Sequence, residues 1–178
     1  MTNTIDPRNA DSTASLDELD SGVGWRVLSG TDIVSTERIT ALLDEFDRSF
    51  AERAFTPAER CYCDAQANPP QHYAARWAAK ESFLKTLGEA VPKVPTTEIG
   101  VEREPTGPRL VLSNQASEAL TDRLRAAGID TSRADLSVCM SHDVTCDRAL
   151  AHVVVVGPTV DASASRRAEP TAEQGGDS

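Results

Sequence analysis

The sequence predicts an α+β domain in which a mainly antiparallel sheet packs against helices. Apolar residues recur with a helical period in some segments and alternate with a strand period in others. These segments do not follow one another in the regular strand-helix order of a parallel sheet. The length of 178 residues suits one domain with a proper core.

The apolar periods are confined to residues 25–157, which we expect to form a single domain. Residues 1–24 and 158–178 are rich in Ser, Thr, Ala, Gly and Asp and show no sustained apolar period. Such segments cannot bury enough apolar surface to offset the entropy lost on ordering. We therefore expect an acidic disordered tail at the N-terminus and a second disordered tail at the C-terminus.

Composition and charge exclude several classes of protein. The chain carries 28 acidic and 18 basic side chains, a net charge of −10, which argues against binding nucleic acid or an anionic membrane through charge alone. No run approaches the roughly 18 apolar residues of a membrane span, and the first residues lack a secretory pattern. Four cysteines fit reduced thiols, so we expect a cytoplasmic protein.

The domain begins with a strand over residues 25–34, which has Val27 and Ile33 on one face and Asp32 and Val34 on the other. A helix follows, for which the N-cap is Ser35 or Thr36. Its apolar stripe has a helical period and consists of Ile39, Leu42, Leu43, Phe46 and Phe50.

The run Thr56-Pro57-Ala58-Glu59 predicts the start of a second, short helix with a capping box. Asn68-Pro69-Pro70 is expected to end it. The third helix is expected from about His72 to Leu87, with Gly88 as its C-terminal stop.

The remaining elements are two short strands, a helix and a final pair of strands. The short strands cover residues 98–102 and 109–112 and are joined by a loop through Gly107-Pro108. Asn114 begins a helix that Gly128 closes. The last two strands cover residues 136–142 and 149–156, and the second is apolar enough to be central.

Glu81 is the first candidate for chemistry. At about 100° per residue, Trp77, Glu81 and Leu84 share one face of the third helix, so we expect the carboxylate to lie in a buried stripe. A buried carboxylate requires a cation or a metal as its partner. The alternative is a surface pair of Glu81 with Lys85, one turn further on.

Asp32 is the second candidate, because carboxylates are disfavoured in the middle of a strand. The alternative is that the strand ends at Asp32, whose side chain then caps a turn. Together, Asp32 and Glu81 could form a two-carboxylate site for Mg²⁺, which keeps several waters and also binds substrate phosphates. The cations on the third helix, Arg76, Lys80 and Lys85, suit a polyphosphate ligand.

Histidines and cysteines give weaker signals. His142 follows a strand, and a histidine there is more often structural than catalytic; His72 and His152 have still weaker claims. Cys61 and Cys63 would point about 200° apart on a helix, so a zinc site is not expected. The glycine-rich phosphate loops and the nucleophile elbow of hydrolases do not occur.

Five blocks of residues, spread over about residues 27–156, resemble the holo-[acyl-carrier-protein] synthases of the 4'-phosphopantetheinyl transferase superfamily. In chain order they are Gly30-Thr31-Asp32-Ile33-Val34, Glu37-Arg38-Ile39, the run from Phe50 to Glu59, the run from Ala74 to Lys85, and Ser141-His142-Asp143. The chain departs from the family at Thr31, where an apolar residue is usual, and at Trp77, where phenylalanine is common. Neither departure removes an expected ligand.

The resemblance implies an enzyme that transfers 4'-phosphopantetheine from coenzyme A to a serine of an apo acyl-carrier protein and releases 3',5'-ADP. Asp32 and Glu81 would hold Mg²⁺ against the diphosphate, and Glu81 or a water on the metal would take the serine proton. Lys85 would neutralise the diphosphate, so Asp32, Glu81 and Lys85 are the implied catalytic residues.

The remaining roles also follow from the resemblance. Arg76 and His142 would bind the 3'-phosphate of coenzyme A, Lys80 would add to the coenzyme site, and Gly107-Pro108 would meet the adenine. The acidic carrier protein would dock on Arg38 and Arg53. A homotrimer with active sites between subunits is implied, acting in fatty acid biosynthesis. The alternatives are a noncatalytic coenzyme A or carrier-protein binding module and a magnesium-dependent phosphoesterase.

Overall fold

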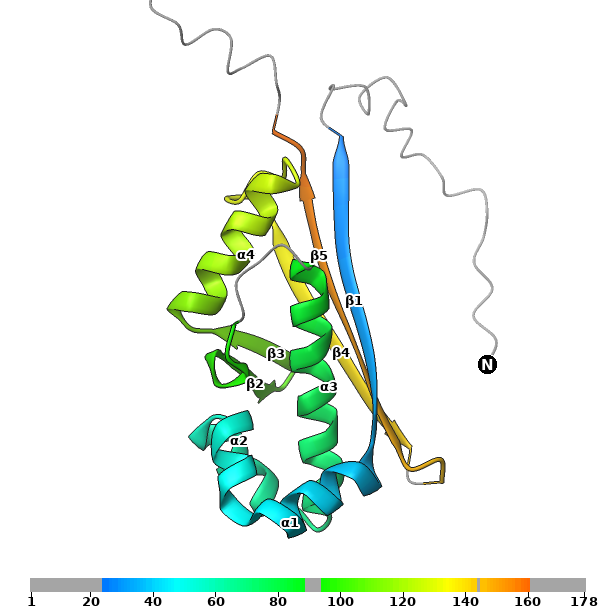
Figure 1. Cartoon of the computed structure of the whole chain (residues 1–178). Helices are drawn as coiled ribbons and strands as arrows, with labels where there is room; N and C mark the ends of the chain where they lie inside the picture. Colours follow the sequence, from blue (N-terminus) through cyan, green and yellow to red (C-terminus); the bar gives the residue numbers. More distant parts are fainter. Residues whose placement is uncertain (1–23, 89–93, 144, 161–178) are drawn as a thin grey trace, which may run out of the picture.

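The computed structural model describes residues 24–88, 94–143 and 145–160. Its largest sheet has three antiparallel strands, β1 (Trp25–Ser35), β5 (Arg148–Pro158) and β4 (Asp135–Asp143), in the order β1-β5-β4. The helices lie on one side of this sheet (Figure 1). The α+β prediction is confirmed, as is the central position of β5.

Helix α3 (Pro69–Leu87) packs on the inner face of the sheet, mainly against β1 and β5. Small side chains make this close packing feasible, namely Ala74, Ala75, Ala78 and Ala79, all of them buried. Gly30 of β1 is part of the same contact, because a Cβ at this position would lie 2.1 Å from the backbone oxygen of Ser82. The helix therefore lies closer to β1 than any residue other than glycine would allow at position 30.

Helices α1 (Thr36–Ala54) and α2 (Pro57–Asp64) cover the beginning of α3. Ser35 caps α1, accepting a hydrogen bond from the backbone of Arg38, and α2 begins with the predicted capping box. The prediction that Asn68-Pro69-Pro70 ends the second helix is wrong. The two prolines form the first turn of α3, where their missing N–H groups have no partner to lose, whereas α2 ends at Asp64.

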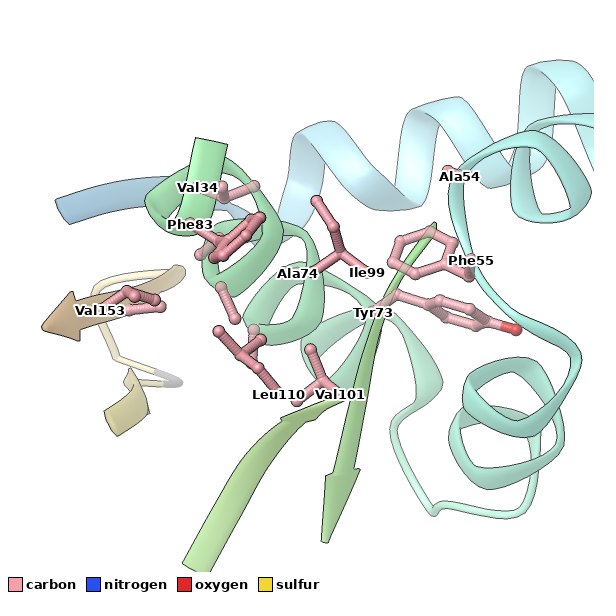
Figure 2. Packing of buried hydrophobic residues seen from close by; sticks show 14 of the residues in the cluster. Val34, Ala54, Phe55, Tyr73, Ala74, Phe83, Ile99, Val101, Leu110 and Val153 are labelled. Atoms are coloured by element: carbon pink, nitrogen blue, oxygen red, sulfur yellow. The ribbon is translucent and has the colours of Figure 1, made fainter. Parts of the chain in front are cut away.

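A second sheet is formed by β2 (Ile99–Glu104) and β3 (Gly107–Leu112), which follow the short 3₁₀-helix η2 (Thr96–Glu98). Gly107 and Pro108 begin β3, so the turn of this hairpin precedes them instead of running through them. Helix α4 (Asn114–Ala126) comes next, and Gly128 follows it with a φ of 65°. The core between these layers includes Phe55, Tyr73, Phe83, Ile99 and Val153 (Figure 2).

The predicted C-terminal boundary at residue 157 falls inside β5, which continues to Pro158. Thr159 then donates a backbone hydrogen bond to the carbonyl of Gly24, so these two residues lie side by side. Residues 1–23 and 161–178, which make up most of the two expected tails, lie outside the described residues.

The outer face of the large sheet carries several exposed apolar side chains. Val27 and Ile33 share this face as predicted, each about 60% exposed (61% and 60%), and Leu150 of β5 lies directly opposite Ile33. Asp32 and Val34 face inward, toward α3. The polar residue Asp32 is therefore on the side of the sheet that the helices cover. In the described residues, no helix is long and apolar enough to cross a membrane.

Candidate active site

Asp32 and Lys85 form an ion pair where α3 passes over β1. The Lys85 Nζ donates to Asp32 Oδ1 at 2.8 Å and to the carbonyl oxygen of Thr31 at 2.9 Å. Strand β1 continues through Asp32 to Ser35, so the alternative in which the strand ends at Asp32 is wrong. The close approach at Gly30 brings the lysine within reach of the strand.

Glu81 lies one helical turn before Lys85 and is half-buried. Burial raises the pKa of Glu81 above its ordinary value, the charge of Asp32 raises it further, and Lys85 and Arg38 act in the opposite direction. The two carboxylates are thus close enough to influence each other. The alternative surface pair of Glu81 with Lys85 is not among the ion pairs of the described residues, in which Lys85 contacts Asp32 instead.

The donor set of Asp32 and Glu81 fits Mg²⁺. Within the described residues no group of three or more His, Cys, Asp or Glu side chains could enclose a metal ion. A pair of carboxylates leaves coordination positions open for water and phosphate, which is how Mg²⁺ is usually bound. Burial is the larger cause of the raised pKa of Glu81, and the repulsion from Asp32 that adds to it is what a divalent cation would relieve.

The expectation that Glu81 lies in a buried stripe is wrong. Trp77, Glu81 and Leu84 form the partly exposed side of α3, while the residues around them are buried. The reason is that α3 is covered on most of its circumference by the sheet, α2 and β2, and only this narrow face is left. Trp77 is itself partly covered by Phe50 of α1.

Lys80 does not belong to the site, contrary to the sequence prediction. Its side chain is 0% exposed, and its Nζ lies 2.8 Å from Glu59 Oε2 and 2.7 Å from the carbonyl oxygen of Thr96. Glu59 also accepts hydrogen bonds from the backbone of Thr56 and of Val101. Lys80 is therefore a buried structural cation that joins α3 to α2 and β2, and it cannot contact a polyphosphate.

A pocket of about 300 Å³ brings together Arg76, His142, Gly107 and Pro108, which the sequence placed in one ligand site. Arg76 is 4% exposed, and its guanidinium lies 4.0 Å from the centre of the Tyr62 ring. Its Nε has no hydrogen-bond partner among the described residues. The positive charge of this arginine at the wall of the pocket suits an anionic ligand.

The carboxylate pair and the pocket lie on opposite sides of α3. Asp32 belongs to edge strand β1 and His142 to edge strand β4, with β5 between them, so their strands are roughly 10 Å apart. On α3, Glu81 and Arg76 are five residues apart, which turns them about 140° from each other. One chain therefore does not bring the two groups of predicted residues into a single cavity.

Arg38 and Arg53 are both exposed on α1. Among the described residues Arg38 has no ion pair, and Arg53 Nε donates to the carbonyl oxygen of Ser49. Both residues thus lie at the surface of the described part of the chain.

Sequence reasoning gave too little weight to His72. It lines the pocket, and its ring centre lies 5.7 Å from that of His142. The signal was available, because His72 and Arg76 are four residues apart and so share one face of α3. Glu59 was interpreted only as part of a helix cap, since nothing in its local sequence shows that Lys80 packs against it.

Comparison with known proteins agrees with this geometry. Residues 29–139 match the family model of the 4'-phosphopantetheinyl transferase superfamily. A holo-[acyl-carrier-protein] synthase of Syntrophus aciditrophicus is 43% identical over 111 residues, covering 61% of this chain and 84% of that one. A holo-[acyl-carrier-protein] synthase of Gluconobacter oxydans is 40% identical over 152 residues, covering 80% of this chain and 93% of the other.

Among solved structures, the Helicobacter pylori holo-[acyl-carrier-protein] synthase in complex with coenzyme A is similar. It superposes with a TM-score of 0.55 at 29% identity and covers 71% of this chain and 98% of its own. The chain belongs to the 4'-phosphopantetheinyl transferase superfamily. The prediction of an enzyme of the holo-[acyl-carrier-protein] synthase kind is thereby confirmed, and the noncatalytic and phosphoesterase alternatives give way to it.

Proposed function

We propose that this chain transfers the 4'-phosphopantetheine group of coenzyme A to a serine hydroxyl of an apo acyl-carrier protein, releasing 3',5'-ADP, with Mg²⁺ as the required ion. The observation that carries the proposal is the cluster of Asp32, Glu81 and Lys85 at the junction of α3 and β1. Two interacting carboxylates and one cation at a partly exposed position suit the transfer of a phosphoryl group.

In this reaction the serine oxygen attacks the phosphorus that carries phosphopantetheine, and the bond from that phosphorus to the bridging oxygen of 3',5'-ADP breaks. Glu81, or a water on the metal, is the proposed acceptor of the serine proton. Lys85 would offset the charge that develops on the 5'-phosphate oxygen of the departing 3',5'-ADP. Mg²⁺ held by Asp32 and Glu81 would supply further electrostatic stabilisation of that charge.

The pocket is the proposed seat of the adenosine 3'-phosphate. Arg76 and His142 would bind the phosphate, and Gly107 and Pro108 at the start of β3 would border the adenine. The position of the Arg76 charge at the wall of the pocket supports this role.

A homotrimer with shared active sites is the proposed assembly. The diphosphate and the 3'-phosphate of coenzyme A are attached to the same ribose, but Asp32 and Arg76 lie on opposite sides of α3. The Asp32 side of one chain would therefore need to face the pocket of a neighbour. The exposed apolar face of the large sheet, with Val27, Ile33 and Leu150, supports such an association because it is otherwise costly to leave in water.

The acidic carrier protein is proposed to dock on Arg38 and Arg53, because both are exposed on α1 and Arg38 also influences Glu81. The proposed location is the cytoplasm, since all four cysteines are free thiols.

The proposal is tested by the intact mass of an apo acyl-carrier protein after incubation with the enzyme, coenzyme A and Mg²⁺. We expect the mass to increase by one phosphopantetheinyl group, only when Mg²⁺ is present and only if the carrier serine is intact. An unchanged mass with several carrier proteins would refute the proposal.

A further inference from the structure

Two histidines face each other in the pocket, although the proposed reaction uses only one of them. His72 comes from the first turn of α3 and His142 from β4, and their rings meet edge to face with centres 5.7 Å apart. Tyr62 of α2 also packs against His72, with ring centres 5.8 Å apart. The His72 ring is therefore held in place by three elements of the fold.

The charged groups around the pair leave a net positive pocket. Arg76 of α3 and Arg103 of β2 line it together with the histidines. The acidic residues that line it come from β2, and Arg109 of the neighbouring strand forms ion pairs with both of them, Glu102 and Glu104. Arg76, Arg103 and Arg109 together carry three positive charges against two carboxylates, so the group is net positive by one charge with the histidines neutral.

We infer that His72 binds the 3'-phosphate of coenzyme A together with His142 and Arg76. The enzyme then prefers coenzyme A to 3'-dephospho-coenzyme A, and this preference depends on pH. This inference rests on the proposed function and adds a specificity-determining residue to it. A phosphate monoester matches the surroundings, because its charge suits Arg76 and Arg103 and its oxygens accept from imidazole N–H groups.

The direction of the pH dependence follows from the surroundings of His72. Burial lowers the pKa of His72 below its ordinary value of 6.5, and His142, Arg76 and Arg103 lower it further. The free enzyme therefore holds His72 neutral at pH 7.5. A phosphate dianion beside it favours the protonated ring and raises its pKa, so binding takes up a proton and strengthens as the pH falls.

The first test compares the two coenzymes with the full chain. A phosphate monoester loses its second proton near pH 6. Between pH 7.0 and 8.5 a change in binding therefore reflects protonation of the enzyme and not of the phosphate. We expect kcat/KM for coenzyme A to exceed that for 3'-dephospho-coenzyme A by roughly tenfold or more at pH 7.0, and by less at pH 8.5. Calorimetry in two buffers of different ionisation enthalpy should show proton uptake with coenzyme A only.

Two variants separate a role in recognition from a role in packing. His72→Phe keeps an aromatic ring beside Tyr62 and His142 but cannot carry a proton, so we expect a smaller preference that changes less with pH than that of the unmodified enzyme. His72→Lys carries a permanent charge, so we expect a preference that is large at every pH in this range. If both variants keep the preference and proton uptake of the unmodified enzyme, the inference is overturned.

Failure of the proposed function would be visible separately. An enzyme that transfers nothing to a carrier protein, yet binds coenzyme A more tightly than its dephospho form through His72, would refute the transferase and support the inference. An active transferase whose preference between the two coenzymes is unchanged in the His72 variants would support the proposed function and refute the inference.

Discussion

Two lysines on helix α3, five residues apart, each contact a carboxylate at 2.8 Å, and yet their situations differ. Lys80 and its partner Glu59 have side chains that are 0% and 1% exposed, whereas Lys85 and Asp32 are 52% and 18% exposed. Burial lowers the pKa of Lys80, and Glu59 counteracts this effect. An ion pair between a lysine and a carboxylate thus holds elements together at Lys80, whereas at Lys85 it lies where a ligand could reach it.

The difference shows that surroundings decide what an ion pair does. A buried pair is expensive to form and more expensive to break, because a charge without a partner would remain in the interior. A partly exposed pair contributes about 0–1 kcal/mol to stability and can open toward a phosphate at little cost. We therefore expect stability to depend on Lys80 and catalysis to depend on Lys85 and its neighbours.

The largest effect is expected from Lys80→Met, which leaves Glu59 buried without its cation. We expect a loss of about 3–5 kcal/mol in the free energy of unfolding, measured with urea, which is a large share of a typical domain stability of about 5–15 kcal/mol. A variant as stable as the unmodified enzyme that has lost its activity would place Lys80 in the active site and break the comparison.

Glu81→Gln tests the partly exposed cluster itself. We expect transfer to fall by roughly 1,000-fold or more while the unfolding free energy is retained, because the shape is kept and the negative charge is lost. Asp32→Asn, the matched variant, should instead raise the Mg²⁺ concentration needed for half-maximal activity. Full turnover of Glu81→Gln at saturating Mg²⁺ would remove Glu81 from the mechanism.

Lys85→Met is the counterpart of Lys80→Met on the same helix. We expect kcat to fall by about 100-fold, since one preorganised charge is removed from beside the leaving 5'-phosphate. The unfolding free energy should change by less than about 1 kcal/mol. Equal losses of stability in the two lysine variants would show that exposure does not separate their roles.

The smallest effect is expected from Arg38→Glu, on the exposed side of α1. The enzyme carries a net charge of −10, so an acidic carrier protein needs a local cationic patch to approach. We expect a several-fold rise in KM for the carrier protein and an almost unchanged KM for coenzyme A. The KM of the unmodified enzyme for the carrier protein should also rise more steeply with salt than the KM of the variant does. If the unmodified enzyme and the variant have equal KM values for the carrier protein at low salt, Arg38 takes no part in docking.

Much of the fold could be predicted because its signals are local. The capping box at Thr56 and Glu59, the stop at Gly88 and the apolar run of β5 each appear in a few consecutive residues. Asn68-Pro69-Pro70 was ambiguous, since prolines both follow one helix and begin the next. The choice depends on packing against the sheet, which no local pattern contains.

The candidate site was predictable in part for the same reason. Asp32, Glu81 and Lys85 stand out as polar residues in apolar surroundings, and the structure brings them together. Lys80 looks like Lys85 in the sequence, because its burial depends on α2, which approaches from a different part of the chain. The separation of Asp32 from the pocket depends on the strand order, which the sequence analysis left open.

Gly30 has no side chain to contact a substrate, and yet it sets the distance between the lysine and the aspartate of the site. A single methyl group there would collide with the backbone of Ser82 at 2.1 Å and with Lys85 Cβ at 2.9 Å. In a saturation library selected for activity, position 30 would therefore tolerate replacement as poorly as a metal ligand does. Intolerance at this position would reflect the short distance between the backbones of β1 and α3. A map of the active site drawn from such a library would therefore include a residue that has no side chain to take part in the reaction.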